Sequence, residues 1–286
     1  MRIDAAITWA VSQLVQSESP SVDAKVLLCF VLNKPASYLF TWPEQQLSEQ
    51  QEESFRALIA RRRQGVPVAY LTGKRDFWTL SLTTSSHTLI PRPDTEVLVE
   101  QVLERIQVQK NAGSFPANLS ICDLGTGTGA IALALASELV DAKVIGVDFI
   151  EQAVTLANEN AQQNNIPNAH FFKSDWFSAL SNKKFHVIVA NPPYIENTSP
   201  FLSQGDVRFE PESALTSGPD GLNDIRHIVE HAPNYLHQDG ILAFEHGFNQ
   251  ANAVAQLLEQ RGFTSVKNIQ DYGGNDRVTL GYWRTC

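Results

Sequence analysis

The feature that most constrains the fold is the alternation of short apolar segments with helical segments from residue 119 to the end of the chain. Apolar, strand-like runs and helix-like runs follow one another in the order strand 119–124, helix 130–139, strand 143–148, helix 153–163, strand 170–173, strand 185–190, helix 224–236, strand 241–246, helix 250–261, strand 264–270 and strand 277–283. Strands that alternate with helices predict an α/β fold with a mostly parallel sheet covered on both faces. The short turn at 271–276 predicts an antiparallel end to that sheet.

The residues before this pattern predict two further regions. Apolar positions at helical spacing indicate a small helical domain over residues 1–73, in which a helix begins at Ser48. The basic run Arg61–Arg63 is interpreted there as a solvated helix end. A β-prone stretch predicts a hairpin linker at 74–90, so the α/β domain is expected to span 91–286.

A glycine turn follows the first strand of the α/β domain. Gly125, Thr126, Gly127, Thr128 and Gly129 form a GxGxG pattern, which differs from the GxGxxG of dinucleotide-binding turns. Asp123 stands just before the turn, where its carboxylate would repel a diphosphate and would suit a cationic ligand such as an ammonium group.

Acidic residues also follow the next two strands. Asp148 ends the second strand and can accept hydrogen bonds from two ribose hydroxyls, while Asp175 and Trp176 follow the third strand and can hold an adenine. A nucleoside with a cationic amino-acid tail describes S-adenosyl-L-methionine, which the sequence therefore predicts as the cofactor.

The fourth strand ends in Asn191, Pro192, Pro193 and Tyr194. The Asn191 side-chain carbonyl and the Pro192 backbone carbonyl can accept the two hydrogens of a planar NH2 group, and Tyr194 offers a flat face for stacking. The motif predicts a site for an amide or amino-heterocycle nitrogen. The segment 191–223 that follows is longer than usual loops, which predicts a lid or substrate loop.

Local chemistry predicts roles for three residues before the first α/β strand. Arg92 lies between two prolines, which hold the cation in one place, so a supporting role at the site is expected. Asp94 or Thr95 is expected to cap the helix that follows.

Charge and cysteine content narrow the class of protein. The net charge of −9 argues against a wide surface for nucleic-acid phosphates. Cys29, Cys122 and Cys286 lack the spacing of a zinc site and are expected to be reduced thiols, with no metal bound. No secretory signal and no apolar run of membrane-spanning length is present, so a cytoplasmic protein is expected.

Taken together, these motifs resemble the class I S-adenosylmethionine-dependent methyltransferases, and more narrowly the HemK/PrmC family. The resemblance implies a Rossmann-like, mostly parallel seven-stranded sheet. It also implies methyl transfer to N5 of the glutamine in the Gly-Gly-Gln motif of class 1 peptide chain release factors, with S-adenosyl-L-homocysteine as the product. By the same resemblance, Gly125–Gly129, Asp148 and Trp176 bind the cofactor, Asn191 contacts both cofactor and glutamine, and residues 191–194 frame the target amide. Glu245 in the Glu-His-Gly motif is expected to support the site.

Three alternatives remain at this point. One is a catalytically silent cofactor-binding module on the ribosome, which the intact Asn-Pro-Pro-Tyr motif disfavours. A sister enzyme methylates a glutamine of a ribosomal protein and shares the Asn-Pro-Pro-Tyr motif. Adenine-N6 DNA methyltransferases also carry that motif, but they must extrude a base and grip the DNA around it, which the acidic charge disfavours.

Overall fold

The computed structural model describes residues 1–284, so Cys286 lies outside the described part. The chain divides into two compact units. The first consists of Met1–Lys74 together with Ser203–Phe209, and the second of Arg75–Leu202 together with the chain from Glu210 onward. The sequence predicted a boundary near residue 73 but did not predict that 203–209 groups with the N-terminal segment.

The first unit is a set of short helices around one apolar core. Its helices are α1 (Ile3–Gln13), α2 (Pro20–Leu32), α3 (Ala36–Thr41), α4 (Glu49–Arg63) and α5 (Val68–Thr72). Ser48 caps α4 in a capping box: its hydroxyl accepts from the Gln51 N–H, and the Gln51 side chain accepts from the Ser48 N–H. Apolar residues at helical spacing, such as Leu27 and Phe55, are fully buried between these helices.

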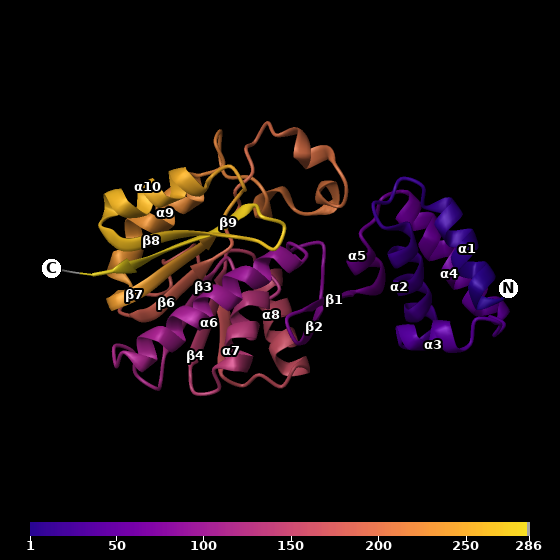
Figure 1. Cartoon of the computed structure of the whole chain (residues 1–286), viewed down its shortest axis with the longest axis horizontal. Coiled ribbons are helices and arrows are strands. Elements are labelled where there is room, and N and C mark those ends of the chain that lie inside the picture. The colour runs from indigo at the N-terminus through magenta and orange to yellow at the C-terminus, as the bar shows by residue number, and fades with distance from the viewer. Residues whose placement is uncertain (285–286) are drawn as a thin grey trace. The chain divides into compact units, whose positions relative to one another are not determined.

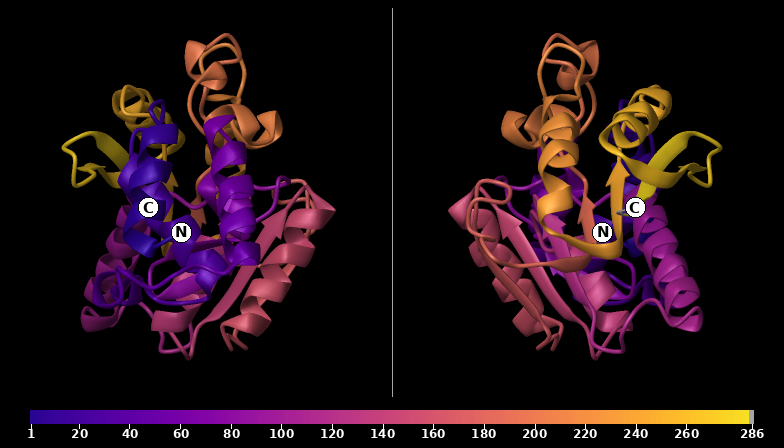
Figure 2. Two further views of the ribbon diagram at one scale, coloured as in Figure 1. Left: turned by 90° about the vertical axis from the view of Figure 1, so that its right-hand side faces the viewer. Right: turned by 90° about the vertical axis from the view of Figure 1, so that its left-hand side faces the viewer.

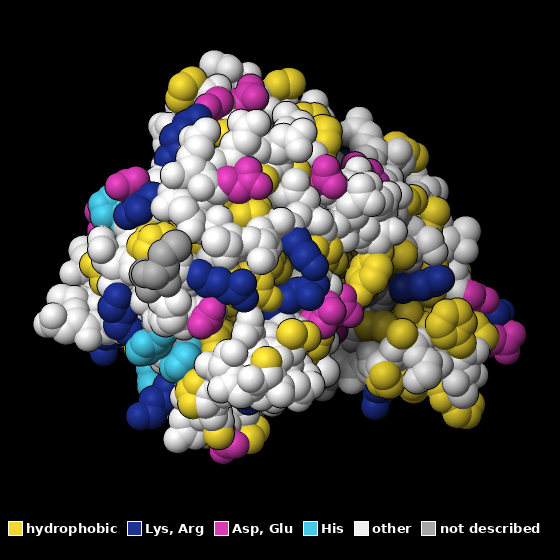
Figure 3. All heavy atoms as spheres, turned by 60° about the vertical axis from the view of Figure 1, so that its left-hand side comes forward, with side chains coloured by type: hydrophobic (Ala, Val, Ile, Leu, Met, Phe, Trp, Pro, Cys, Tyr) yellow, Lys and Arg dark blue, Asp and Glu magenta, His cyan; other side chains and the backbone are white. Residues whose placement is uncertain are grey.

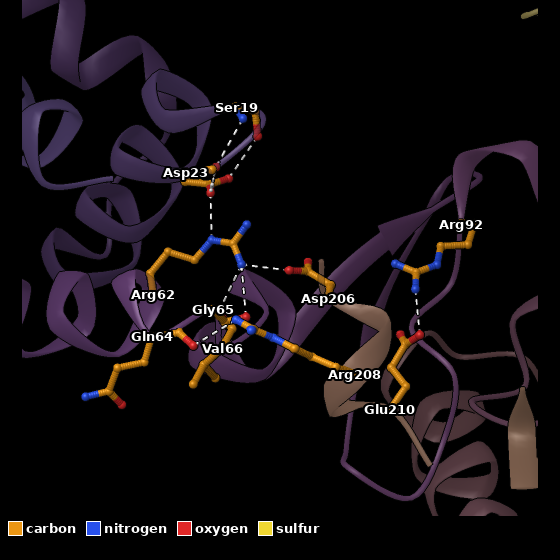
Figure 4. Close-up of polar contacts among 11 residues, drawn as sticks. Ser19, Asp23, Arg62, Gln64, Gly65, Val66, Arg92, Asp206, Arg208 and Glu210 are labelled. Atoms are coloured by element: carbon orange, nitrogen blue, oxygen red, sulfur yellow. Dashed lines mark hydrogen bonds and ion pairs between the residues drawn. The ribbon is translucent and has the colours of Figure 1, made fainter. Parts of the chain in front are cut away.

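The interpretation of Arg62 as a solvated residue is wrong. Its side chain is only 12 % exposed, because it lies between two acids of the same unit. Arg62 Nε donates to Asp23 Oδ2 at 2.7 Å, and Nη1 donates to Asp206 Oδ1 at 2.7 Å (Figure 4). Arg61 and Arg63 are exposed, as expected. The ion pairs of Arg62 explain why 203–209 belongs to this unit.

The second unit begins with a β-hairpin and continues as an α/β domain. The hairpin strands β1 (Lys74–Phe77) and β2 (Leu80–Thr83) form a two-stranded sheet of their own. The remaining regular elements are η1 (Pro93–Thr95), α6 (Glu96–Asn111), β3 (Ser120–Leu124), α7 (Ala130–Glu138), β4 (Lys143–Asp148), α8 (Glu151–Gln163), β5 (Ala169–Lys173), β6 (Phe185–Ala190), α9 (Asn223–His231), η5 (Ala232–Asn234), β7 (Leu236–Glu245), α10 (Ala251–Arg261), β8 (Phe263–Gln270) and β9 (Asp276–Trp283). Helix α6 ends at Asn111, and Ala112 follows as its C-cap.

The predicted seven-stranded, mostly parallel sheet is confirmed. Its strand order is β5-β4-β3-β6-β7-β9-β8. The five strands from β5 to β7 run parallel, whereas β9 is antiparallel to both β7 and β8. The antiparallel end predicted from the short last turn is therefore present.

The central strands bury both of their faces. Helices α6, α7 and α8 cover one face, and α9 and α10 cover the other (Figures 1 and 2). Alternate residues of β6 divide between the two cores, since Val187 and Val189 pack on one side and Ile188 and Ala190 on the other. Burial on both faces explains why these strands are continuous apolar runs in the sequence.

The long connection between β6 and α9 contains three short 3-10 turns, η2 (Pro200–Ser203), η3 (Val207–Phe209) and η4 (Glu212–Ala214). A parallel bridge between Ile195 and Thr216 holds the base of the connection. Among the described residues, no helix combines the length and the apolar character that crossing a membrane requires.

Candidate functional site

A cavity of about 370 Å³ lies at the carboxyl ends of the parallel strands. Residues that follow four different strands line it: Gly125–Thr128 after β3, Phe149 and Ile150 after β4, Ser174–Trp176 after β5, and Asn191 and Pro193 after β6. Asp148, the last residue of β4, also lies on the wall. Because parallel strands end at one edge of the sheet, residues far apart in sequence share this wall. The volume is in the range of small-ligand sites.

The glycine turn shapes one side of the cavity. Gly125 has φ +72° and Gly127 has φ +55°, values that side-chain-bearing residues adopt rarely. The N–H of Gly127 donates to Asp148 Oδ2 at 2.9 Å, which ties the turn to the end of β4. The turn therefore lies against the acid that was predicted to contact a ribose.

Asp148 presents its carboxylate at the cavity. Its Oδ1 accepts from the Ile150 N–H at 2.9 Å, and its Oδ2 accepts from Gly127. Burial raises the pKa of this carboxyl above its ordinary value. Each carboxylate oxygen has a second lone pair, so two further hydroxyl donors can still be accepted.

Trp176 and Asp175 lie on the wall after β5. Trp176 has φ +44°, which is uncommon for a bulky residue and is concentrated at functional positions. Its indole lies 3.5 Å from the point that a Cβ of Gly125 would occupy. A side chain at position 125 would thus contact the ring and narrow the cavity.

Asp123 does not lie on the cavity wall. It is fully buried, with Oδ2 accepting from Thr126 Oγ1 at 2.6 Å and from the Ala132 N–H at 3.3 Å. Its Oδ1 is buried and has no hydrogen-bond partner within the described chain. Burial raises the pKa of Asp123 to about 7. The structure gives this acid a role in holding Thr126, and its contact with a ligand ammonium stays a prediction.

The buried Asp123 predicts a specific dependence of stability on pH. Because its folded pKa of about 7 exceeds the ordinary value of 3.8, stability that is present in acid is lost as the pH rises towards 7. Between pH 5 and this pKa the free energy of unfolding falls by about 1.4 kcal/mol per pH unit, which gives about 3 kcal/mol in total. Asp123→Asn should abolish this decline, as measured by urea denaturation at pH 5 and pH 8. A variant whose stability falls as much as that of the wild type would contradict the assignment.

Asn191 directly follows β6, and only the nitrogen of its side-chain amide has a hydrogen-bond partner within the described residues. Nδ2 lies 3.4 Å from Thr95 Oγ1, and the buried Oδ1 has no partner within the described residues. Pro193 lies on the cavity wall with Asn191, whereas Pro192 is buried and lies outside the wall. A buried acceptor without a partner is costly unless a ligand satisfies it.

Tyr194 is not brought to the cavity wall. Its hydroxyl donates to Glu245 Oε1 at 3.4 Å, and its backbone carbonyl accepts from Gln250 Nε2 at 3.0 Å. Burial raises the pKa of the phenol and also that of the fully buried Glu245. Glu245 thus supports residue 194 directly, and stacking of a ligand on Tyr194 stays a prediction.

Arg92 has a structural partner within the second unit. Its Nη2 donates to Glu210 Oε2 at 2.6 Å, and the Glu210 side chain is fully buried (Figure 4). The Ile90 N–H donates to Glu210 Oε1 at 3.0 Å. Arg92 and Glu210 therefore fasten the segment before α6 to the connection after β6, and Arg92 lies outside the cavity wall.

The wall also includes residues that the sequence interpretation missed. These are His87, Thr88, Leu89, Pro91, Thr95, Ala130, Ile131, Val147, Phe149, Ile150, Ser174, Ser213, Ala214 and Asp224. Position after a strand could have indicated Phe149, Ile150 and Ser174, and Ser213 with Ala214 lies in the 191–223 segment that was expected to be a lid or substrate loop. No local signal distinguishes the others. Gly129 precedes α7 with φ +84° and does not line the cavity, and a Cβ at this position would lie 3.2 Å from the side chains of Ala157 and Phe171.

Comparisons with known proteins find a matching family for each of the two parts of the chain. Residues 5–73 match the family described as PrmC N-terminal domain, and residues 116–272 match the methyltransferase domain family. The release factor glutamine methyltransferase of Vibrio cholerae serotype O1 is 52 % identical, covering 99 % of this chain and 97 % of the relative. That of Escherichia coli K12 is 50 % identical over 95 % of both chains.

A methyltransferase from Pyrococcus furiosus has a similar solved structure. It is 18 % identical, with a TM-score of 0.52, over 80 % of this chain and 98 % of that one. At that identity the similarity concerns the fold alone, and it agrees with the class I methyltransferase architecture of the second unit.

Proposed function

The chain belongs to the release factor glutamine methyltransferase family, and from this premise we propose its reaction, its substrate and the roles of its residues. It transfers a methyl group from S-adenosyl-L-methionine to the side-chain amide nitrogen, N5, of the glutamine in the Gly-Gly-Gln motif of peptide chain release factors. S-adenosyl-L-homocysteine is the other product, and the nitrogen releases one proton to water. The observation that carries the proposal is the match to enzymes of that name along nearly the whole chain, in both units.

The residues of the cavity fit the cofactor. The Asp148 carboxylate has free lone pairs for the two ribose hydroxyls, and Trp176 with Asp175 suits the adenine. The glycine turn leaves room for close approach of the ligand to the backbone. When bound, the cofactor supplies an electrophilic methyl group on a sulfonium.

Positioning of the target amide is the task of Asn191 and Pro192. An amide nitrogen is a poor nucleophile because its lone pair is delocalised, and an ordinary side-chain base would not deprotonate it at neutral pH. The unpartnered Oδ1 of Asn191 accepts one N–H of the glutamine, and the Pro192 carbonyl accepts the other. Good orientation of two reactants lowers a barrier by roughly 7–11 kcal/mol.

The same two acceptors favour the transition state over the bound substrate. As the nitrogen gains positive charge, its two hydrogens bind these oxygens more tightly. Only interactions that strengthen in the transition state raise kcat, and these are of that kind. Arg92 and Glu245 support the site through Glu210 and Tyr194.

The proposed partners are class 1 release factors, and the proposed place of action is the cytoplasm, where these factors work. Direct sequence-specific binding of nucleic acid is not part of the proposal. The net charge is −9, and on the face in Figure 3 Lys and Arg side chains lie beside Asp and Glu side chains. The relatives' name favours release factors over the alternative substrates, a ribosomal protein or DNA adenine.

The test is intact-mass spectrometry of a purified release factor after incubation with this protein and S-adenosyl-L-methionine. A gain of one methylene, mapped to the glutamine of the Gly-Gly-Gln loop, is expected. The ribosomal protein and a DNA duplex serve as parallel substrates. Methyl on either of them, with the release factor unchanged, would overturn the proposed substrate while keeping the cofactor site.

A further inference from the structure

Two segments that lie outside the parallel sheet contribute to the cavity wall. The stretch before α6 provides Pro91 and Thr95, and the connection after β6 provides Ser213 and Ala214. Neither segment belongs to one of the seven strands, so the sheet does not fix them. Their positions in the wall therefore depend on contacts made by side chains and turns.

Glu210 joins the two segments through both oxygens of its carboxylate. Oε1 accepts from the Ile90 N–H at 3.0 Å, and Oε2 accepts from Arg92 Nη2 at 2.6 Å (Figure 4). The Glu210 side chain is fully buried, although 120 residues separate it from Ile90 in the sequence. A buried carboxylate that loses its partners is not compensated by water, so this junction is costly to open.

A short turn connects this junction to Asn191 on one side. Turn η1 follows Arg92, and the Thr95 N–H donates to the Arg92 carbonyl at 3.1 Å. The Thr95 hydroxyl oxygen accepts from Asn191 Nδ2 at 3.4 Å. The expectation that Asp94 or Thr95 caps α6 is wrong, since neither η1 nor α6 has a side-chain cap hydrogen bond. Thr95 instead links the segment that Glu210 holds to the residue proposed to bind the target amide.

A second turn connects the junction to Tyr194 on the other side. Pro211 directly follows Glu210 and precedes η4, and the Ala214 N–H donates to the Pro211 carbonyl at 2.9 Å. The carbonyl of Leu215, the next residue, accepts from the Tyr194 N–H at 3.2 Å. Through this turn, Glu210 is also tied to the last residue of the Asn-Pro-Pro-Tyr motif.

The two turns, the motif and Glu210 form a closed series of contacts, which we call the acceptor ring. The ring consists of residues 90–95, 191–194 and 210–215. It includes Asn191 and the Pro192 carbonyl, the two proposed acceptors for the target amide. Asp148 and the glycine turn, which are proposed to bind the cofactor, lie outside it. Glu210 therefore closes the part of the cavity that is assigned to the substrate.

We propose that Glu210 is a positioning residue that closes the acceptor ring and thereby holds Asn191 and the Pro192 carbonyl in line with the methyl donor. The inference rests on the proposed function, because it states how the target-amide site is kept in place. A displacement of about 1 Å at a reacting group can cost about 100-fold in rate, so an open ring lowers kcat. Glu210 acts through Ile90 and Arg92, since it is not on the cavity wall itself.

The first test compares Glu210→Met with Glu210→Gln. Methionine has a similar length but no strong acceptor, so it opens the ring at both contacts, whereas glutamine keeps an oxygen for the Ile90 N–H. We expect Glu210→Met to lower kcat for release factor methylation about 10- to 100-fold. Glu210→Gln should retain kcat within about fivefold of wild type. The Kd for S-adenosyl-L-methionine should stay within about threefold in both variants, because the cofactor residues lie outside the ring.

A second test follows the ring without using the substrate. Amide hydrogen exchange, measured by NMR, reports the local opening of single N–H groups. In Glu210→Met, the Ile90 and Tyr194 N–H groups should exchange at least about tenfold faster, because both donate within the ring. The Gly127 N–H, which donates to Asp148 on the cofactor side, is the internal control and should keep its rate.

Four results would overturn the positioning role. The first is a wild-type kcat in Glu210→Met. The second is an equal loss of kcat in Glu210→Gln while its Ile90 N–H stays protected, because a closed junction would then not maintain kcat. The third is equal acceleration of exchange at Ile90 and Gly127, which would show general destabilisation. The fourth is a cofactor Kd that rises in step with the loss of kcat.

Arg92 provides a milder change at the same junction if Glu210→Met does not fold. Arg92→Met leaves the buried Glu210 carboxylate without its cation and should lower kcat about 3- to 10-fold, whereas Arg92→Lys should keep kcat within about twofold. Equal kcat values in the two variants would overturn the role. A wild type that leaves the release factor unmethylated would instead overturn the proposed function, and the exchange rates would still decide whether Glu210 closes the ring.

Discussion

Asn191→Ala is expected to lower kcat for release factor methylation about 10²- to 10³-fold, the usual effect of removing one hydrogen-bonding group aimed at a developing charge. The reason is that alanine removes the buried, unpartnered Oδ1 that the proposal places against the target nitrogen. Because this contact strengthens in the transition state, the loss should appear in kcat and little in KM.

Single-turnover methylation followed by intact mass, with cofactor affinity from calorimetry, checks this expectation. The Kd for S-adenosyl-L-methionine should stay within about fivefold of wild type, because Asp148 and the glycine turn remain. Asn252→Ala is a matched control, since Asn252 is exposed on α10 and the truncation is the same. A variant at position 191 that methylates at a near wild-type rate would refute the assignment.

Asp148→Ala is expected to act on cofactor binding, raising the Kd for S-adenosyl-L-methionine about 10- to 100-fold. Hydrogen bonds to a charged group contribute about 1.5–3 kcal/mol, and alanine removes the acceptor for the two ribose hydroxyls. It also leaves the Gly127 and Ile150 N–H groups without their acceptor, so the turn at the cavity loses its tie to β4. Both effects weaken the same binding step.

Isothermal titration calorimetry measures this change directly. Asp141→Ala is the control, because Asp141 is exposed just before the other end of β4. At saturating cofactor, kcat should recover most of its wild-type value, in contrast to Asn191→Ala. Unchanged affinity after Asp148→Ala would refute the proposed ribose contact.

The two variants together separate binding of the donor from alignment of the acceptor. If both variants lowered kcat without changing cofactor affinity, the proposed division of the cavity would be wrong. That division places cofactor binding beside β4 and alignment of the target amide beside β6. The structure supports the division, since Asp148 ends β4 and Asn191 follows β6, the two strands on either side of β3.

The sequence by itself determined the parts that depend on local pattern. Continuous apolar runs at 143–148 and 185–190 specify buried parallel strands, because both of their faces are covered. The polar residues at the ends of those strands then gather at one edge, and this places Asp148 and Asn191 around one cavity. The Ser48 capping box depends only on residues three apart, so it too is visible in the sequence.

Only the tertiary structure decided which polar groups face the cavity and which are bonded away from it. Asp123 lies beneath the glycine turn with Thr126, and Tyr194 is directed to Glu245, although both were expected to contact ligands. Thr95 was expected to cap a helix, yet α6 has no side-chain cap hydrogen bond, and the amide of Asn191, 96 residues away in the chain, donates to the Thr95 hydroxyl. The direction in which a side chain donates or accepts depends on neighbours brought close by folding, and sequence spacing does not contain that information.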